Sequence, residues 1–373
     1  MNEKVSSRQI IFLIIINRIT TILTVMSTIY MSPANQDIWI IIILSFFYTM
    51  LSSIPLLYLA NKFNDFTIIG YLEKIFGKVL GKGIGALYGV FFGTIAILFS
   101  YITIQMIRSS FLTDTKPGMI ISVLIVICVY ISSKGMGTML SSGELFIPII
   151  LTSLIAFAFL GYKNIDLSLL LPVYKDSNFL DINIGAIQLS LIFIDIYPLT
   201  VIVPKLEDKK HINKIFVKSV CYSLLFVLMV VIVTQTGLGI EQAKHSNFPF
   251  LTYVRRIKAY SVFERIESVY TIMWISAMII KITTYIYLSY QSFKEIFRKQ
   301  KKGISLYIIG ALVGLTTYYL AEINPMMVEI KPIQLSEYIY YFIFKTLIPL
   351  IALVVYLFRR KSFEKQERLG NFR

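Results

Sequence analysis

The sequence contains little charge, little cysteine and little histidine. Charged residues make up 15% of its 373 positions, whereas an ordinary globular domain has about 25%. Its two cysteines, Cys128 and Cys221, both lie in apolar runs, which excludes a disulfide scaffold and leaves no metal-ligand spacing. Its two histidines, His211 and His245, form no cluster. Because neither a metal-ligand set nor a nucleophile–base pair is visible, we expect no metal, no cofactor and no enzymatic activity.

Apolar residues are abundant instead, at 56% of the chain, and the mean hydropathy is +0.73. This is too apolar for a soluble protein of this length and for a disordered chain. The formal net charge of +15 raises the question of nucleic acid. The basic residues lie in short clusters between apolar runs, however, as they do in the cytoplasmic loops of membrane proteins. We therefore expect a lipid bilayer as partner and no nucleic acid.

Ten apolar stretches reach, or nearly reach, the roughly 20 residues that a helix needs to cross the hydrocarbon core. They are residues 10–30, 38–60, 84–107, 119–132, 145–160, 184–203, 215–233, 266–288, 304–320 and 338–357. The fourth and fifth are the weakest, because they are short and close together. The first is longer than the apolar region of a signal peptide, about 7–15 residues, so we interpret it as a span. We predict a single transmembrane domain over residues 1–373.

The positive-inside rule gives the orientation of these spans. With the N-terminus inside, the cytoplasmic segments carry more than twice as many of the 36 lysines and arginines as the external segments do. We therefore predict that both termini are cytoplasmic.

Half of the external basic residues fall in one connection, between the seventh and eighth spans. There Phe250, Tyr253, Ile257 and Tyr260 recur at helical spacing, with basic residues between them. This pattern predicts an amphipathic helix over residues 249–262 that lies in the membrane interface. It would either pack against lipid headgroups or serve as a docking surface or external gate.

Ten spans suggest two inverted halves of five, here residues 10–160 and 184–357, with discontinuous helices at matching places. Those places are spans one and six. Span one contains a run of polar and β-branched residues, which weaken a helix, and span six contains Pro198, whose ring clashes with the carbonyl near Ile194. We predict that both spans are broken. The alternatives are a continuous helix and an ordinary proline kink.

Four charges lie within the spans, namely Arg18, Asp195, Lys281 and Lys345. A charge at the bilayer centre costs at least about 2.5–3.5 kcal/mol on insertion scales, so it usually faces the bundle interior. Lys345 is close to the outer end of span ten, and we expect it to snorkel outward. A pair of Asp195 with Arg18 or Lys281 would neutralise two charges. It would be a structural salt bridge or part of a ligand site, because an amino-acid zwitterion needs partners of both signs.

The candidate ligand-binding residues are polar, aromatic or backbone-exposing positions on spans one, three, six and eight. They are Asn17, Arg18, Thr20, Thr21, Thr24, Tyr101, Gln105, Ile194, Asp195, Tyr197, Lys281, Thr284 and Tyr285. Such residues on membrane helices often make interhelical hydrogen bonds instead, which is the structural alternative for each of them.

Short motifs spread over nearly the whole chain resemble those of the spore germination receptor B subunits. They are Asp37-Ile38-Trp39 at span two, Ile75-Phe76-Gly77-Lys78 before span three, Pro204 with the basic loop after span six, Phe248-Pro249 with Tyr253-Val254-Arg255, and Phe263-Glu264-Arg265-Ile266-Glu267-Ser268 leading to Trp274. The resemblance implies a LeuT-like fold of the amino acid–polyamine–organocation transporter superfamily, with ten helices in a five-plus-five inverted repeat. It also implies nutrient sensing in the spore inner membrane, beside a receptor A subunit and a lipoprotein C subunit.

One departure from that superfamily lies in span one. Its members usually carry a glycine-rich break there, whereas this sequence has Thr20-Thr21-Ile22 just after Arg18. Bare backbone N–H groups facing a ligand carboxylate are therefore less expected here. Either Arg18 supplies a cation in their place, or the ligand is not a simple amino acid. We expect either a germinant-sensing subunit that binds a small nutrient near the bilayer midplane, or a permease for amino acids or amines that is coupled to protons through Asp195. The sequence does not name the ligand.

Overall fold

The computed structural model describes residues 4–32, 34–175, 177–257, 266–297, 304–323 and 333–368. Within these residues the regular secondary structure is helical, apart from one isolated bridge between Val5 and Leu206. Nine helical segments of the described chain are long and apolar enough to cross a membrane, and α5 (Pro117–Ser133) is a shorter apolar helix. Together they follow the order of the ten predicted spans.

The spans of the first half are α1 (Ser7–Tyr30), α2 (Ile38–Lys62), α4 (Lys78–Ser110), α5 and α6 (Met136–Leu160). Those of the second half are α7 (Phe179–Ile192) with α8 (Ile196–Ile202), α9 (Ile212–Leu238), α12 (Ile266–Phe297), α13 (Ile304–Ile323), and α14 (Leu335–Phe342) running through a π-helical turn (Ile343–Leu347) into α15 (Ile348–Arg368). Three short helices connect them: α3 (Ile68–Phe76), α10 (Ile240–Lys244) and α11 (Pro249–Arg255).

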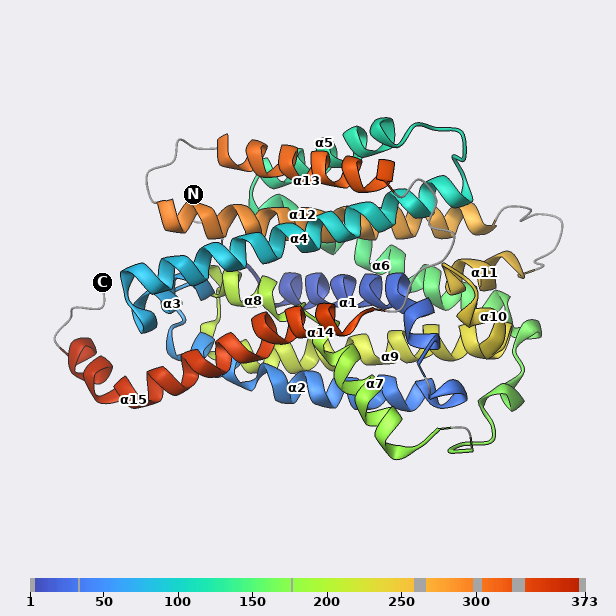
Figure 1. Ribbon diagram of the computed structural model, residues 1–373, viewed down its shortest axis with the longest axis horizontal. Coiled ribbons are helices and arrows are strands. Elements are labelled where there is room, and N and C mark those ends of the chain that lie inside the picture. The colour runs from blue at the N-terminus through green and yellow to red at the C-terminus, as the bar shows by residue number, and fades with distance from the viewer. Residues whose placement is uncertain are drawn as a thin grey trace.

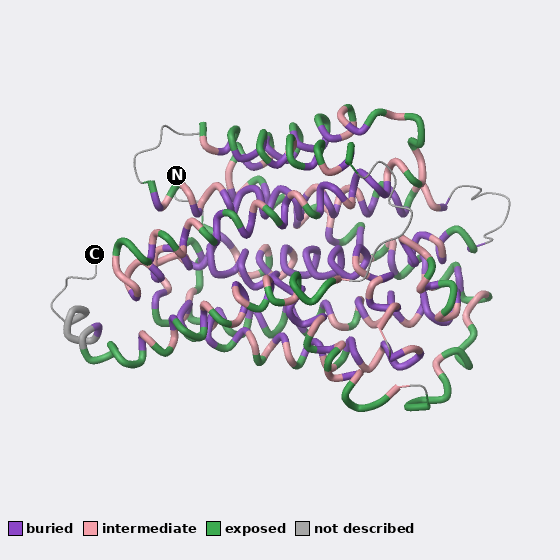
Figure 2. Tube along the Cα trace, in the orientation of Figure 1, coloured by how far each residue is buried: buried purple, intermediate pink, exposed green. Residues whose placement is uncertain are grey.

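The helices form a bundle around α1, which lies near its middle and is buried along almost its whole length (Figures 1 and 2). Four of the five pairs of corresponding spans in the two predicted halves pack on each other: α1 on α8, α2 on α9, α4 on α12 and α5 on α13. Cross-contacts are mirrored as well, since α2 packs on α7 as α9 packs on α1. Two five-span repeats related by a two-fold axis produce such packing. The boundaries of the repeats, 10–160 and 184–357, stay a prediction.

Helix α1 runs from Ser7 to Tyr30 without interruption, so the predicted break in span one is not found. The polar side chains that suggested it bond within their own helix. The amide of Asn17 donates to the carbonyl of Leu13 at 2.8 Å, and the hydroxyl of Thr21 donates to the carbonyl of Asn17 at 2.8 Å. A side chain that bonds the carbonyl of the preceding turn is satisfied in a continuous helix.

Span six is broken, as predicted. Helix α7 ends at Ile192 and α8 begins at Ile196, and residues 193–195 between them are not helical. Pro198 lies in the first turn of α8, where its missing N–H costs no intrahelical bond. The break also removes the clash that its ring would make with the carbonyl of Ile194 in a continuous helix. The proline therefore fixes where span six divides.

The connection after span seven differs from its prediction. Helix α11 ends at Arg255, so it is shorter than the predicted range of 249–262, of which residues 258–262 lie outside the described chain. Its apolar side chains Phe250, Leu251 and Tyr253 are buried. They pack on α9, α12 and α1, because α11 folds back over the end of the bundle. The apolar face of this helix is therefore covered by protein.

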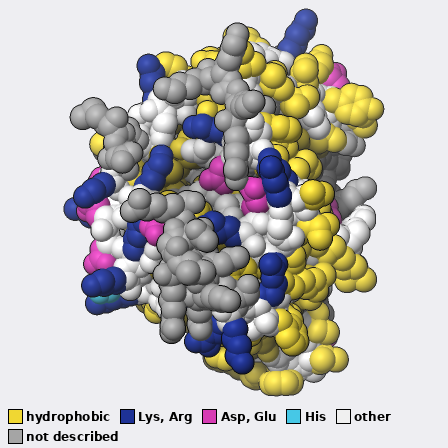
Figure 3. Space-filling model, turned by 90° about the vertical axis from the view of Figure 1, so that its left-hand side faces the viewer, with side chains coloured by type: hydrophobic (Ala, Val, Ile, Leu, Met, Phe, Trp, Pro, Cys, Tyr) yellow, Lys and Arg dark blue, Asp and Glu magenta, His cyan; other side chains and the backbone are white. Residues whose placement is uncertain are grey.

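Both termini lie at the same end of the bundle (Figure 1). Lysine and arginine side chains are spread around that end, with acidic side chains near its middle (Figure 3). Lys209, in the loop after span six, bonds Asp65, in the loop after span two, at 2.6 Å. A cation-rich end is what the positive-inside rule associates with the cytoplasm, and the orientation itself remains a prediction.

Two glycines at the start of α4 give a matched test of the packing between α3 and α4. A Cβ at Gly81 would lie 2.3 Å from the Cα of Glu73 and 2.8 Å from the carbonyl oxygen of Leu72, whereas a Cβ at Gly83 would meet nothing within 4 Å. We expect Gly81→Ala to cost roughly 1–3 kcal/mol by overpacking. Gly83→Ala should be neutral or stabilising by up to about 1 kcal/mol. Thermal unfolding in detergent measures both, and equal midpoints would contradict the close approach.

Candidate functional site: a buried ion pair at the broken helix

Arg18 and Asp195 form a direct ion pair inside the bundle. Arg18 donates from Nη2 to Oδ2 of Asp195 at 2.6 Å and from Nε to the same oxygen at 2.9 Å. The two side chains are 0% and 2% exposed. Asp195 is the last residue of the break in span six. The ion pair therefore links the continuous helix of span one to the broken helix of span six.

Aromatic rings surround the guanidinium group of Arg18. Its Cζ lies 4.7 Å from the ring centroid of Phe46 on α2 and 4.6 Å from that of Phe193 in the break. A cation over an aromatic face gains about 2 kcal/mol when both are desolvated. A guanidinium group is weakly hydrated and planar, so it suits such a site better than an ammonium group does.

Lys281 on α12 bonds to span one and does not form the alternative ion pair with Asp195. Its Nζ donates to the carbonyl of Asn17 at 2.8 Å and to the hydroxyl of Thr21. It also lies 3.8 Å from the ring centroid of Phe99 on α4. Span one is thus held by an ion pair on one side and by a lysine on the other.

Lys345 is buried, which contradicts the expectation that it snorkels outward. It lies in the π-helical turn of span ten, and its Nζ donates to the carbonyl of Ser190 in the last turn of α7. In a continuous helix that carbonyl would accept from the amide of Ile194, which bonds the carbonyl of Ile192 instead at 2.9 Å. The break in span six therefore creates the acceptor that Lys345 uses.

The same π-helical turn also contacts the other half of span six. The carbonyl of Phe344 accepts the hydroxyl of Tyr197 on α8 at 2.7 Å and the hydroxyl of Tyr88 on α4 at 2.8 Å. A π-helical turn shifts the regular backbone pairing of a helix and is frequent at functional sites. Span ten thus holds α7 through Lys345 and α8 through Phe344. We refer to these contacts as the span-ten bridge.

Three side-chain atoms of this centre have no hydrogen-bond partner within the described chain: Arg18 Nη1, Asp195 Oδ1 and Asn17 Oδ1. Buried polar groups are nearly always paired, and an unpaired one costs about 1–3 kcal/mol. Water or the polar atoms of a ligand would satisfy them. The buried ion pair and Asn17 therefore offer one donor and two acceptors for hydrogen bonds to a bound molecule.

The structure brings six of the candidate residues together, namely Asn17, Arg18, Thr21, Ile194, Asp195 and Lys281. Six others are buried but have no hydrogen bond to the ion pair within the described chain; they are Thr20, Thr24, Tyr101, Tyr197, Thr284 and Tyr285, and the remaining candidate, Gln105, is buried on α4. The hydroxyls of the three threonines among them donate to carbonyls of their own helices. Their part in ligand binding stays a prediction.

Sequence reasoning missed the aromatic residues of the centre, Phe46, Phe99 and Phe193, as well as Tyr88. Of these, Phe193 could have been found from the sequence, because it directly precedes the predicted break at Ile194. Phe46, Phe99 and Tyr88 are ordinary positions of long spans, and what their side chains contact depends on how the helices pack. Among the described residues no group of three histidine, cysteine, aspartate or glutamate side chains is placed to hold a metal ion.

The fold belongs to a known class of membrane transporters. The structure is similar to that of MhsT in complex with L-phenylalanine, with a TM-score of 0.66 and 11% identity over 95% of this chain and 88% of that one. It is also similar to a Na⁺-coupled sialic acid symporter in a substrate-bound outward-open state, with a TM-score of 0.65 and 10% identity over 86% of this chain and 75% of that one. The chain is thus an all-α membrane protein with the LeuT-like transporter fold, as predicted.

The sequence comparisons identify the family. A family model described as spore germination protein matches residues 4–325. Spore germination protein KB of Bacillus subtilis (strain 168) is 21% identical over 377 residues, which cover 98% of this chain and 97% of that protein. The chain belongs to the spore germination protein family, which confirms the resemblance seen in its motifs. It is a multi-pass membrane protein whose family and fold are those of transporters and receptors.

A double-substitution series tests whether Arg18 and Asp195 act as one unit. Arg18→Met and Asp195→Leu each leave an unpaired buried charge, which typically costs about 3–5 kcal/mol, whereas removing both charges costs much less. We expect the double variant to recover at least half of the loss in thermal unfolding midpoint.

Arg8→Met is the control for this series. Arg8 pairs with Glu144 at 3.5 Å at the surface, where its side chain is 68% exposed, and such pairs contribute less than about 1 kcal/mol. A double variant that unfolds no later than the worse single variant would show that the charges are not coupled.

The tyrosine pair of the span-ten bridge should behave non-additively. Tyr88→Phe or Tyr197→Phe leaves one donor for the carbonyl of Phe344, and should cost about 0.5–1.5 kcal/mol. The double variant leaves a buried carbonyl without a side-chain donor, so its loss should exceed the sum of the single losses. Thermal unfolding measures this, with the exposed Tyr319→Phe as control. Additive losses would mean that the two hydroxyls do not share this acceptor.

Proposed function

We propose that this protein is the germinant-sensing membrane subunit of a spore germination receptor, and that it binds a small nutrient beside the break in span six. The observation that carries the proposal is the cluster of buried charges there. Arg18 and Asp195 are fully desolvated, and each retains one polar atom without a partner in the described chain. Membership of the spore germination protein family supports the physiological role.

The charges of the centre indicate which chemical group the nutrient carries. Arg18 is a buried cation paired with the buried acid Asp195, and the amino groups of Lys281 and Lys345 are buried on neighbouring spans. The two lysines donate to neutral carbonyl and hydroxyl oxygens. A ligand carboxylate would accept from the Nη1 of Arg18, and Asp195 Oδ1 would accept from a ligand N–H or O–H. The solved relatives of this fold are named for L-phenylalanine and sialic acid, and both molecules carry a carboxylate.

Binding would act on the receptor through the two halves of span six. To drive a two-state element from mostly off to mostly on, a ligand must prefer the on state by about 5.5 kcal/mol. The break gives α7 and α8 separate orientations that a bound nutrient can select. The span-ten bridge connects both halves to α15, which packs on α2 and α3 at the end of the bundle where the termini lie.

The remaining parts of the proposal concern location and partners. The relative named spore germination protein KB supports assembly with a receptor A subunit and a lipoprotein C subunit in the spore inner membrane. The cation-rich end that carries both termini would face the cytoplasm. The larger subunits would then take the signal onward, since the described chain is a transmembrane bundle with short connections.

A permease for amino acids or amines, coupled to protons through Asp195, is the second candidate. The transporter fold and the buried acid favour it. Uptake of radiolabelled amino acids by vesicles that contain the purified full chain separates the two functions. Saturable accumulation that depends on a proton gradient identifies a permease, whereas binding without accumulation identifies a sensor.

The substitution Asp195→Asn tests the site directly, because asparagine keeps an oxygen for Arg18 and removes the negative charge. We expect the nutrient concentration for half-maximal germination to rise at least tenfold, while receptor abundance in spores stays within about twofold. Tenfold corresponds to about 1.4 kcal/mol of binding free energy. Dose–response curves and immunoblots of the same spores provide both numbers.

Asp114→Asn is the matched control, since Asp114 is exposed in the loop after α4. It should change neither quantity. If Asp195→Asn lowers abundance and germination in proportion, the ion pair is only a structural salt bridge and the binding site is wrong.

A further inference from the structure

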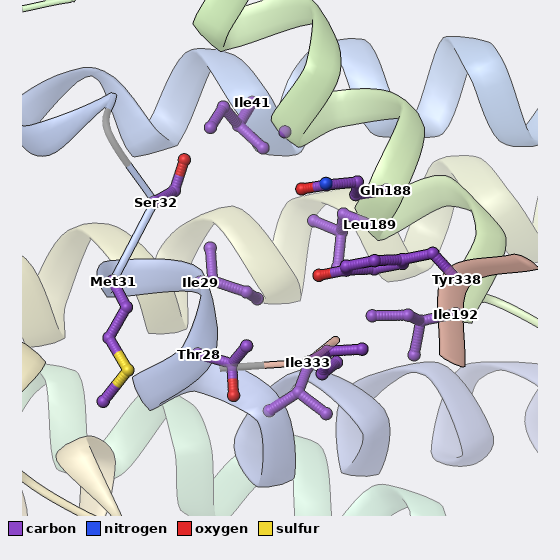
Figure 4. Close-up of a pocket in the computed structure, with 12 residues that line it drawn as sticks. Thr28, Ile29, Met31, Ser32, Ile41, Gln188, Leu189, Ile192, Ile333 and Tyr338 are labelled. Atoms are coloured by element: carbon purple, nitrogen blue, oxygen red, sulfur yellow. The ribbon is translucent and has the colours of Figure 1, made fainter. Parts of the chain in front are cut away.

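A cavity lies apart from the buried ion pair, among spans one, two, six and ten. Its volume is about 160 Å³. It is lined by Val25, Thr28, Ile29, Met31, Ser32, Ile41, Gly185, Gln188, Leu189, Ile192, Ile333 and Tyr338. None of these is a candidate residue of the ionic centre, and Figure 4 shows them converging from α1, α2, α7 and α14.

Among the described residues, the lining contains no charged side chain. Its polar groups include the amide of Gln188 on α7 and the hydroxyl of Tyr338 on α14, which both extend in the direction of Ile29 and Ser32 (Figure 4). Neither group hydrogen-bonds another residue of the described chain. The other walls are mainly aliphatic, with Leu189 and Ile192 from the last turn of α7.

These features define the kind of molecule that fits. An apolar cavity of about 150 Å³ holds a benzene-sized molecule, so the volume suits roughly six to ten non-hydrogen atoms. An amide and a hydroxyl on one side select a partner that can both accept and donate a hydrogen bond. A wall without charge disfavours an ion, because nothing there offsets its desolvation.

We propose that this cavity is a binding site for a small neutral molecule with one hydroxyl or carboxamide group on a compact apolar body. Gln188 and Tyr338 bind the polar group, and the aliphatic wall binds the body. The site is separate from the ionic centre and selects against the carboxylate that the centre suits. Because Ile192 is both part of its wall and the last residue before the break, an occupant fixes how α7 packs on α1.

Binding of benzamide to the purified full chain in lipid nanodiscs tests the proposal. Benzamide is neutral, has nine non-hydrogen atoms by its formula and carries one carboxamide group; benzoate has the same size and a negative charge. Ligand-observed nuclear magnetic resonance with protein-free nanodiscs as blank separates binding from partition into lipid. We expect saturable binding of benzamide in the millimolar range and binding of benzoate at least tenfold weaker.

The double variant Gln188→Leu/Tyr338→Phe preserves the shape of the wall and removes both polar groups. We expect its affinity for benzamide to fall at least tenfold, while its thermal unfolding midpoint without benzamide stays within a few degrees of the unsubstituted protein. Tyr307→Phe on α13, where Tyr307 is 59% exposed, is the matched control and should bind benzamide unchanged.

Three results would overturn the proposal. They are no saturable binding of benzamide, which would mean that the cavity holds only water; equal binding of benzoate; and undiminished binding by a folded double variant. None of them bears on the germinant site at Asp195, which is tested by germination and not by this measurement.

Discussion

A carboxylate and a guanidinium group held inside an apolar bundle constrain the rest of this molecule. Desolvating two such charges costs several kcal/mol per ion, and only good geometry offsets it. Asp195 meets Arg18 because span six is unwound at that residue, and Arg18 is enclosed by rings from α2 and from the break. The pair therefore depends on the break in span six, and the break is stabilised by the pair. Span one remains a continuous helix because its polar side chains bond its own carbonyls.

Span ten contacts span six on both sides of its break. The π-helical turn places Lys345 on the free carbonyl of Ser190 and offers the carbonyl of Phe344 to two tyrosines. Each contact uses a backbone group that regular helix geometry would have occupied. Span ten is thus a third element that contacts both halves of span six. The cavity proposed as a binding site for a neutral molecule is lined by Ile192, the last residue of α7, so both proposed sites border the break in span six.

Much of this could be predicted from the sequence. The ten spans, the break near Pro198, the family and the pairing of Asp195 with Arg18 or Lys281 follow from hydropathy, proline chemistry and the cost of buried charge. The choice between the two pairs could not be predicted, because it depends on the direction in which Lys281 leaves α12. The expected break at Thr20 was wrong, since threonine hydroxyls can bond the preceding turn as readily as they weaken it. Lys345 was expected at the surface because a linear count of residues says nothing of a π-helical turn.

The sequence by itself determined that the chain crosses a membrane and that it must bury several charges, because hydropathy and proline act locally along the chain. Its motifs pointed to the family in the same way. Only the tertiary structure decided which charges meet. The neighbours of Arg18 come from α2 and from the break in span six. The acceptor of Lys345 comes from α7. All of them are distant in sequence from the residues they contact. Contacts of this kind are fixed by how helices pack against one another, and side-chain geometry a few ångströms across decides which buried donor finds which acceptor.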